Sequence, residues 1–253
     1  MKIFIDTAEL REIEEACSWG IVDGLTTNPT LIRRAVDGKS GVDIEAYIER
    51  ICRTVAGPVS LEVASLDADT MVDEAMGLYR RFNPVRENVV IKVPVNTSTG
   101  GEASDFEGLR AMKRLSDKRV PVNATLVMTP EQALLSAKAG AKYVSPFMGR
   151  VDDFADTAEE SQDVIGAMPG SRLVREIVQI LDTYGLECEV IAASIRHVGH
   201  ARAAELAGAQ IATIPFRVLE EMIRHPKTAE GIRRFTDDLV PEYTQLLSVL
   251  GRS

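Results

Sequence analysis

The sequence predicts an α/β fold, a single (β/α)8 TIM barrel with an additional C-terminal helix. The first observation is the length, since 253 residues match the roughly 250 that such a barrel takes. The second is the alternation of short β-branched runs with longer segments of helical period, which is typical of parallel strands joined by crossover helices. The third is that eight such runs can be counted. We expect one barrel domain over residues 1–253, with a helical extension at about 227–250.

The strands are predicted from runs rich in valine and isoleucine, such as KIFID and VVIKV. In chain order they cover residues 2–6, 24–28, 59–63, 89–93, 122–126, 143–147, 189–194 and 211–216. Between them, residues 130–139 and 171–184 carry apolar side chains three and four positions apart, as a helix packed on a barrel requires. Gly140, Gly185 and Gly208 are predicted to end helices, because glycine tolerates the left-handed conformation that follows many of them.

Two connections after predicted strands are longer than the others, residues 96–105 and residues 151–170. The loops that follow the strands of a barrel form its active face. We therefore expect both loops to overhang the site, although each is equally compatible with a tolerated surface insertion.

The tail from residue 217 to residue 250 contains more helix than an eighth barrel helix needs. The pair His225-Pro226 interrupts it, and a second helical stretch begins at Thr228. The final helix is expected to pack either on a neighbouring subunit or under its own barrel.

The composition narrows the class of partner. The net charge of −9 repels a nucleic-acid backbone or an anionic membrane surface, so an anionic ligand must meet locally placed arginines. The three cysteines are too few and too widely spaced for a disulfide framework or a metal motif, which favours a reducing cytoplasm. The sequence has neither a membrane-length apolar run nor a nucleotide-binding glycine motif, and we expect no cofactor and no metal.

Polar side chains lie at or near the ends of the predicted strands, where barrels place catalytic groups. They are Asp6, Asn28, Glu62, Lys92, Asn123, Thr125, Ser145 and Ser194. Lys92 stands between Ile91 and Val93, where burial favours the neutral amine, and a neutral amine attacks ketones to form an imine. The alternative is a lysine that reaches solvent or pairs with Glu62.

The other candidates each have two interpretations. Asp6 and Glu62 suit general acid and base catalysis, or they cap a helix or neutralise a lysine. Asn28 precedes Pro29 and suits either a binding role or a local turn.

Two arginines follow strand ends. Arg150 and Arg196 suit phosphate recognition, or they pair with Asp152 or Glu189. His197 and His200 have no nearby carboxylate or cysteine that would complete a metal site, so we expect a structural or solvent-exposed pair.

Taken together, the motifs resemble the short transaldolases and the related fructose-6-phosphate aldolases. The matching segments are FIDTAE, GLTTNPTLI, VSLEV, VVIKVPV, VNATLV, YVSPFMGRVDD, VIAASIRH and IATIPFRVLEEMIRHP. They cover all eight predicted strands in order.

The resemblance implies a role for each candidate. Lys92 would form the Schiff base, Asp6 would act on the C4 hydroxyl of the substrate, and Glu62 with Thr125 would hold the reaction water. The dihydroxyacetone end would be held by Asn28, Asn123 and Ser145. The distal phosphate would be held by Arg150, Ser194 and Arg196.

Two positions separate the subfamilies. Glu62 and Phe147 resemble the transaldolases, where the aldolases have glutamine and tyrosine, and phenylalanine has no hydroxyl to protonate an enamine. The resemblance thus implies a cytoplasmic transaldolase of the pentose phosphate pathway that acts on sugar phosphates and forms a homo-oligomer, a pentamer or decamer. The alternatives are a fructose-6-phosphate aldolase and a non-catalytic sugar-phosphate-binding barrel.

Overall fold

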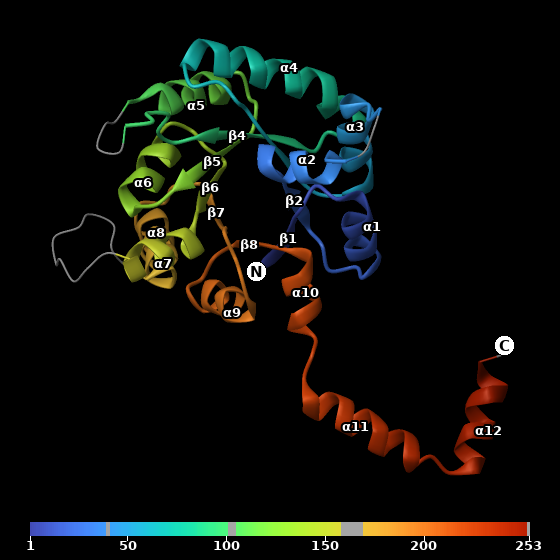
Figure 1. Ribbon diagram of the computed structural model, residues 1–253. Helices are drawn as coiled ribbons and strands as arrows, with labels where there is room; N and C mark the ends of the chain where they lie inside the picture. Colours follow the sequence, from blue (N-terminus) through green and yellow to red (C-terminus); the bar gives the residue numbers. More distant parts are fainter. Residues whose placement is uncertain (39–40, 101–104, 158–168, 252–253) are drawn as a thin grey trace. The chain divides into compact units, whose positions relative to one another are not determined.

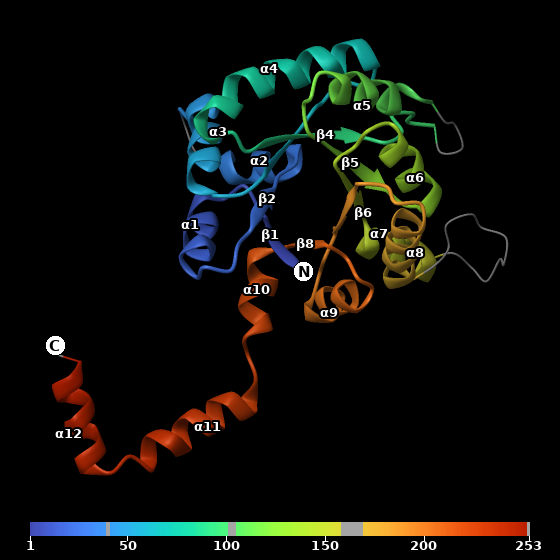
Figure 2. The ribbon, with the colours of Figure 1, turned by 180° about the vertical axis from the view of Figure 1, so that it is seen from behind.

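The computed structural model describes residues 1–38, 41–100, 105–157 and 169–251. Its eight strands are all parallel and close into a barrel in chain order, and helices surround them (Figures 1 and 2), which confirms the predicted fold. The strands are β1 (Lys2–Asp6), β2 (Gly24–Thr26), β3 (Val59–Glu62), β4 (Val89–Pro94), β5 (Val122–Val127), β6 (Tyr143–Pro146), β7 (Glu189–Ala192) and β8 (Ile211–Ile214).

The helices follow the strands as the alternation predicts. They are α1 (Leu10–Ser18), α2 (Pro29–Val36), α3 (Ile44–Thr54), α4 (Ala68–Arg86), α5 (Glu107–Asp117), α6 (Pro130–Lys138), α7 (Met148–Thr157), α8 (Gly170–Thr183), α9 (Val198–Leu206) and α10 (Phe216–Met222). Gly140, Gly185 and Gly208 follow the ends of α6, α8 and α9 with φ values of 93°, 59° and 86°. The predicted left-handed positions are therefore confirmed.

Several element boundaries differ from the prediction. Five strands end one or two residues earlier, and β2 stops at Thr26 because Asn28 already caps α2 by accepting a hydrogen bond from the Leu31 amide at 2.9 Å. The predicted loop 151–170 is wrong over its first part, since α7 runs from Met148 to Thr157 and buries Val151 against the barrel. The rest of that loop, residues 158–168, and residues 101–104 of the other loop lie outside the described residues.

The strand interior explains why the polar candidates gather at one end of the barrel. A buried cluster contains Phe4, Val90, Tyr143, Ile191 and Ile211. In four of these strands the residue two positions later is polar, and side chains two positions apart share one face of a strand. These residues are Asp6, Lys92, Ser145 and Thr213. They form the next layer inside the barrel, above the apolar one.

The chain forms two compact units, Met1–Val218 and Leu219–Ser253. The second contains α11 (Pro226–Asp237) and α12 (Pro241–Leu250), neither of which buries a residue. The predicted break at His225-Pro226 is present, but the tail has a second break because Pro241 begins another helix. None of the helices in the described ranges has the length and apolar character needed to cross a bilayer.

The three cysteines are unpaired thiols. Burial raises the pKa of Cys52 to about 11 and that of Cys188 to about 12. Both groups are therefore thiols rather than reactive thiolates at neutral pH.

Candidate active site

Lys92 is held inside the barrel by two contacts. Its side chain is only 5% exposed, and its Nζ lies 3.0 Å from Glu62 Oε2, whose side chain is 15% exposed. The same nitrogen donates to the carbonyl oxygen of Thr27 at 3.0 Å. Glu62 is the register partner of Lys92 on β3. The lysine therefore does not reach out to solvent, and it pairs with Glu62 as the alternative interpretation allowed.

Asp6 ends β1 and is partly buried at the mouth of the barrel. Its Oδ1 accepts a hydrogen bond of 2.7 Å from the Thr26 hydroxyl. Burial raises the pKa of the Asp6 carboxyl above its ordinary value, the Lys92 ammonium and the Thr26 hydroxyl lower it, and the Glu62 charge raises it. An aspartate with a raised pKa beside a lysine is suited to exchange protons with a bound substrate.

Three polar side chains of β5 and β6 lie behind the lysine. Lys92 is the register partner of Asn123, and Ser145 donates to the Asn123 side-chain oxygen at 2.7 Å. The Asn123 amide donates in turn to Ser60 Oγ at 3.3 Å. Thr125 Oγ1 is buried and has no hydrogen-bond partner in the described part of the chain. A buried hydroxyl normally has a partner, so this atom is positioned to bind a small polar group.

A pocket of about 130 Å³ brings many of these groups together. Its lining residues are Asp6, Thr26, Asn28, Lys92, Ser145, Phe147, Arg150, Ala193, Ser194 and Thr213. Seven of the eleven predicted site residues are in this set. Glu62 does not line the pocket but contacts Lys92, which does, and Asn123 likewise contacts Ser145. Thr125 and Arg196 do not line it.

The backbone is unusual at two of these places. Ser194 lies two residues after the end of β7 with φ of 59°, and Leu126 lies directly after Thr125 with φ of 58°. Left-handed conformations of residues other than glycine are strained and gather at functional sites. Leu126 also marks a shift in the register between β5 and β6. Of these two residues, Ser194 lines the pocket, and Leu126 follows Thr125 on β5.

The arginines are placed differently from each other. Arg150 lines the pocket, and its guanidinium carbon lies 4.9 Å from the centroid of the Phe147 ring. Arg196 forms a two-pronged ion pair with Asp153 of α7. That partner is neither Asp152 nor Glu189, which pair with His200 and Lys2 respectively.

Gly149 explains how Arg196 and Ser194 approach each other. A side-chain carbon at position 149 would lie 3.0 Å from Arg196 Nε and 3.2 Å from Ser194 Oγ. The absence of that carbon leaves both polar groups at the start of α7, beside the pocket.

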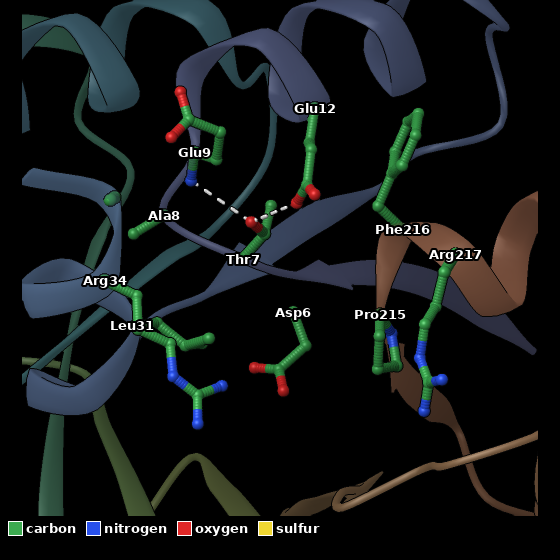
Figure 3. A pocket seen from close by; sticks show the side chains of 11 residues that line it. Asp6, Thr7, Ala8, Glu9, Glu12, Leu31, Arg34, Pro215, Phe216 and Arg217 are labelled. Atoms are coloured by element: carbon green, nitrogen blue, oxygen red, sulfur yellow. Dashed lines mark hydrogen bonds between the residues drawn. The ribbon is translucent and has the colours of Figure 1, made fainter. Parts of the chain in front are cut away.

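A second pocket of about 330 Å³ opens on the other side of Asp6. Figure 3 shows the guanidinium groups of Arg34 and Arg217 extending toward the same end of this pocket as the Asp6 carboxyl, with Glu9 and Glu12 at the other end. Thr7 donates to Glu12, which holds that carboxylate away from Asp6. Arg34 and Arg217 thus bring positive charge to a pocket that Asp6 also lines, in a chain of net negative charge.

The histidines have structural contacts. His197 caps α9 by accepting from the His200 amide at 3.2 Å, and the two rings lie 3.9 Å apart. Within the described ranges no group of three or more histidine, cysteine, aspartate or glutamate side chains is arranged to hold a metal ion.

Four residues that line these pockets were not predicted from the sequence: Thr26, Thr213, Arg34 and Arg217. Threonine is an ordinary strand residue, so nothing in the β2 and β8 runs distinguishes these two. The available signal was their position, since Thr213 lies two residues after the buried Ile211 and Thr26 is the register partner of Asp6.

Comparison with known proteins supports one family. Residues 3–247 match the family described as Transaldolase/Fructose-6-phosphate aldolase. The chain is 45% identical to a probable transaldolase of Alkaliphilus metalliredigens, covering 94% of this chain and 97% of that protein. It is 46% identical to a probable transaldolase of Caldicellulosiruptor saccharolyticus over 94% and 96% of the two chains. It is 43% identical to one of Thermus thermophilus over 94% and 97%.

Proposed function

The chain belongs to the transaldolase/fructose-6-phosphate aldolase family, and on this premise we propose that it is a transaldolase that acts through a Schiff base on Lys92. It would transfer a dihydroxyacetone unit from a ketose phosphate, sedoheptulose 7-phosphate or fructose 6-phosphate, to an aldose phosphate, erythrose 4-phosphate or glyceraldehyde 3-phosphate. The observation that carries the proposal is the contact of Lys92 with Glu62 inside the barrel, beside Asp6.

The covalent step begins at Lys92. Its Nζ transfers a proton to Glu62, 3.0 Å away, and then attacks the C2 carbonyl of the ketose. The resulting carbinolamine loses its hydroxyl as water and becomes an iminium ion. Glu62 and the Thr125 hydroxyl, which has no other described partner, would handle this water when the imine forms and when it is hydrolysed.

Carbon–carbon cleavage uses Asp6. Its carboxylate removes the proton of the C4 hydroxyl while the C3–C4 bond breaks, and the electron pair of that bond passes to the iminium ion. This step releases an aldose phosphate and leaves an enamine on Lys92. The enamine then attacks the aldehyde carbon of the second aldose phosphate, and Asp6 returns the proton to the new hydroxyl.

The two ends of the substrate meet different groups. Asn28 and Ser145 line the pocket with Lys92, and Asn123 orients Ser145, so these three would hold the dihydroxyacetone end. Arg150 and Ser194 line the same pocket, and Arg196 lies next to Ser194 across Gly149. These groups would hold the phosphate.

Phe147 favours transfer over simple cleavage. It lines the pocket, and its ring has no proton to give to the enamine, so the enamine persists until an aldehyde arrives. The competing function, a fructose-6-phosphate aldolase, would release glyceraldehyde 3-phosphate from fructose 6-phosphate alone. We expect rapid release only when erythrose 4-phosphate is added, and equal release without it would favour the aldolase.

The proposal extends to the cellular location, pathway and oligomeric state of the enzyme. We infer a cytoplasmic enzyme of the pentose phosphate pathway with no cofactor, in which residues 1–253 act as one barrel domain with a helical extension at about 227–250. A homo-oligomer, a pentamer or decamer, is supported by apolar side chains exposed on α12, among them Tyr243, Leu246, Leu247, Val249 and Leu250. Sedimentation of the full chain tests the oligomer.

A further inference from the structure

Asp6 is joined to two threonines that have no part in the mechanism described above. The Thr26 hydroxyl lies 2.7 Å from Asp6 Oδ1 and 2.5 Å from the Thr213 hydroxyl. Both threonines are 2% exposed. They belong to β2 and β8, the two strands that pair with β1. The three oxygen atoms thus form a short chain of hydrogen bonds across three adjacent strands, largely shielded from water.

Counting hydrogen atoms fixes the direction of this chain. A threonine hydroxyl has one hydrogen to donate, and an ionised carboxylate can only accept. Thr26 therefore gives its single hydrogen to Asp6 Oδ1, and Thr213 must donate to Thr26. Asp6 Oδ2 takes no part in the chain, so Oδ2 is the oxygen left to take a proton from a substrate hydroxyl.

We propose that Thr213 is a positioning residue which, through Thr26, holds the Asp6 carboxylate with Oδ2 toward the substrate and stabilises its charged form. Each hydroxyl that donates to a carboxylate, directly or through another hydroxyl, lowers its proton affinity, because consecutive hydrogen bonds polarise one another. The inference rests on the proposed function, in which Asp6 must be ionised to start the cleavage.

Other charges also act on Asp6. Lys92 of β4 and Glu62 of β3 lie on the barrel side, and Glu9, Glu12, Arg34 and Arg217 line the outer pocket that Asp6 shares. A change in Lys92 or Glu62 would move the titration of Asp6 by charge. Replacing Thr213 changes no charge, so it isolates the effect of the hydrogen bonds.

The test is the pH dependence of kcat in a graded set of variants of the full chain. Thr213→Val keeps the shape but removes the hydroxyl, and it should move the acidic limb upward by roughly half a pH unit with little change in KM. Thr26→Val removes the direct bond and should move it further, by about one unit or more. Thr213→Ser restores the hydroxyl and should return the limb to its wild-type position.

A matched control and a second measurement complete the design. Ser136→Ala removes a buried hydroxyl that donates within α6, and its pH profile should coincide with that of the wild type. A carbon-13 NMR titration, assigned with Asp6→Asn, measures the pKa of the Asp6 carboxyl without any need for turnover. This pKa should rise from the wild type to Thr213→Val and again to Thr26→Val. The titration therefore still decides the inference if the wild type has no transfer activity and the proposed function fails.

Two results would overturn the role of Thr213. One is a Thr213→Val profile and Asp6 titration that superimpose on those of the wild type. The other is a shift that Thr213→Ser does not reverse, because that would assign the effect to packing of the methyl group.

Discussion

Lys92 Nζ and Glu62 Oε2 lie 3.0 Å apart on register partners of adjacent strands, at side-chain exposures of 5% and 15%. An ion pair so well shielded from solvent leaves the lysine little freedom and places the Glu62 carboxylate where it can accept the lysine proton. The same contact therefore fixes the position of Lys92 and provides a route for its proton, and both roles can be tested.

Replacing Glu62 with glutamine should slow the covalent step. Glutamine keeps the size of the side chain but cannot accept the Lys92 proton, so we expect kcat to fall roughly 100-fold, within the range typical of a lost acid or base group. Rapid-quench trapping of the imine measures the step directly. Glu176→Gln, which breaks an exposed pair with Arg172, is the control, and a Glu62→Gln enzyme of unchanged rate would remove Glu62 from the mechanism.

Asp6 should destabilise the folded protein at neutral pH. Because its pKa is raised in the folded state, the folded form binds the Asp6 proton more tightly than the unfolded chain does. This favourable contribution is complete below the ordinary pKa of 3.8 and is lost as the pH rises through the raised pKa. Asp6→Asn should therefore gain in Tm, relative to the wild type, over the interval from the ordinary pKa of 3.8 up through the raised pKa. A constant difference in Tm across that interval would contradict the raised pKa.

Arg150 should contribute to phosphate recognition. Removing one charge-assisted contact weakens binding by about tenfold to a hundredfold, so Arg150→Ala should raise the KM for fructose 6-phosphate by that factor. The unphosphorylated donor fructose should be used about as well as by the wild type. Arg172→Ala, an exposed arginine on α8, is the matched control. An equal loss with both donors would mean that Arg150 has another role.

Phe147→Tyr should turn transfer partly into cleavage. The new hydroxyl would stand in the pocket that Lys92 and Asp6 line and could protonate the enamine. We expect the release of glyceraldehyde 3-phosphate from fructose 6-phosphate alone to rise about tenfold or more. An unchanged rate of release without acceptor would show that Phe147 does not protect the enamine.

Much of the fold could be predicted because each strand has a strong local pattern. The apolar run and the polar residue two positions later appear together in β1, β4, β6 and β8. The strand ends were harder to place, since the end of β2 depends on the Asn28 cap. The start of α7 followed from no single local signal, and Pro241 divides the second helical stretch of the tail, which was expected to be continuous.

Within the candidate site, Lys92 was predictable from the sequence, whereas Thr26 and Thr213 were not. Lys92 is conspicuous because burying a charged amine among apolar side chains is costly unless the amine is paired or neutral. Thr26 and Thr213 look like ordinary strand formers, and only the closure of β8 against β1 brings Thr213 near Asp6. The pairing of Arg196 with Asp153 joins residues 43 positions apart, which local sequence cannot indicate.

In the proposed mechanism, Lys92 captures the ketose as a covalent adduct. The most direct measurement is borohydride reduction of the full chain in the presence of fructose 6-phosphate, followed by peptide mass mapping. We expect one reduced adduct, located on Lys92 and absent in Lys92→Ala. An adduct on another lysine, or none in an enzyme that turns over, would contradict this mechanism.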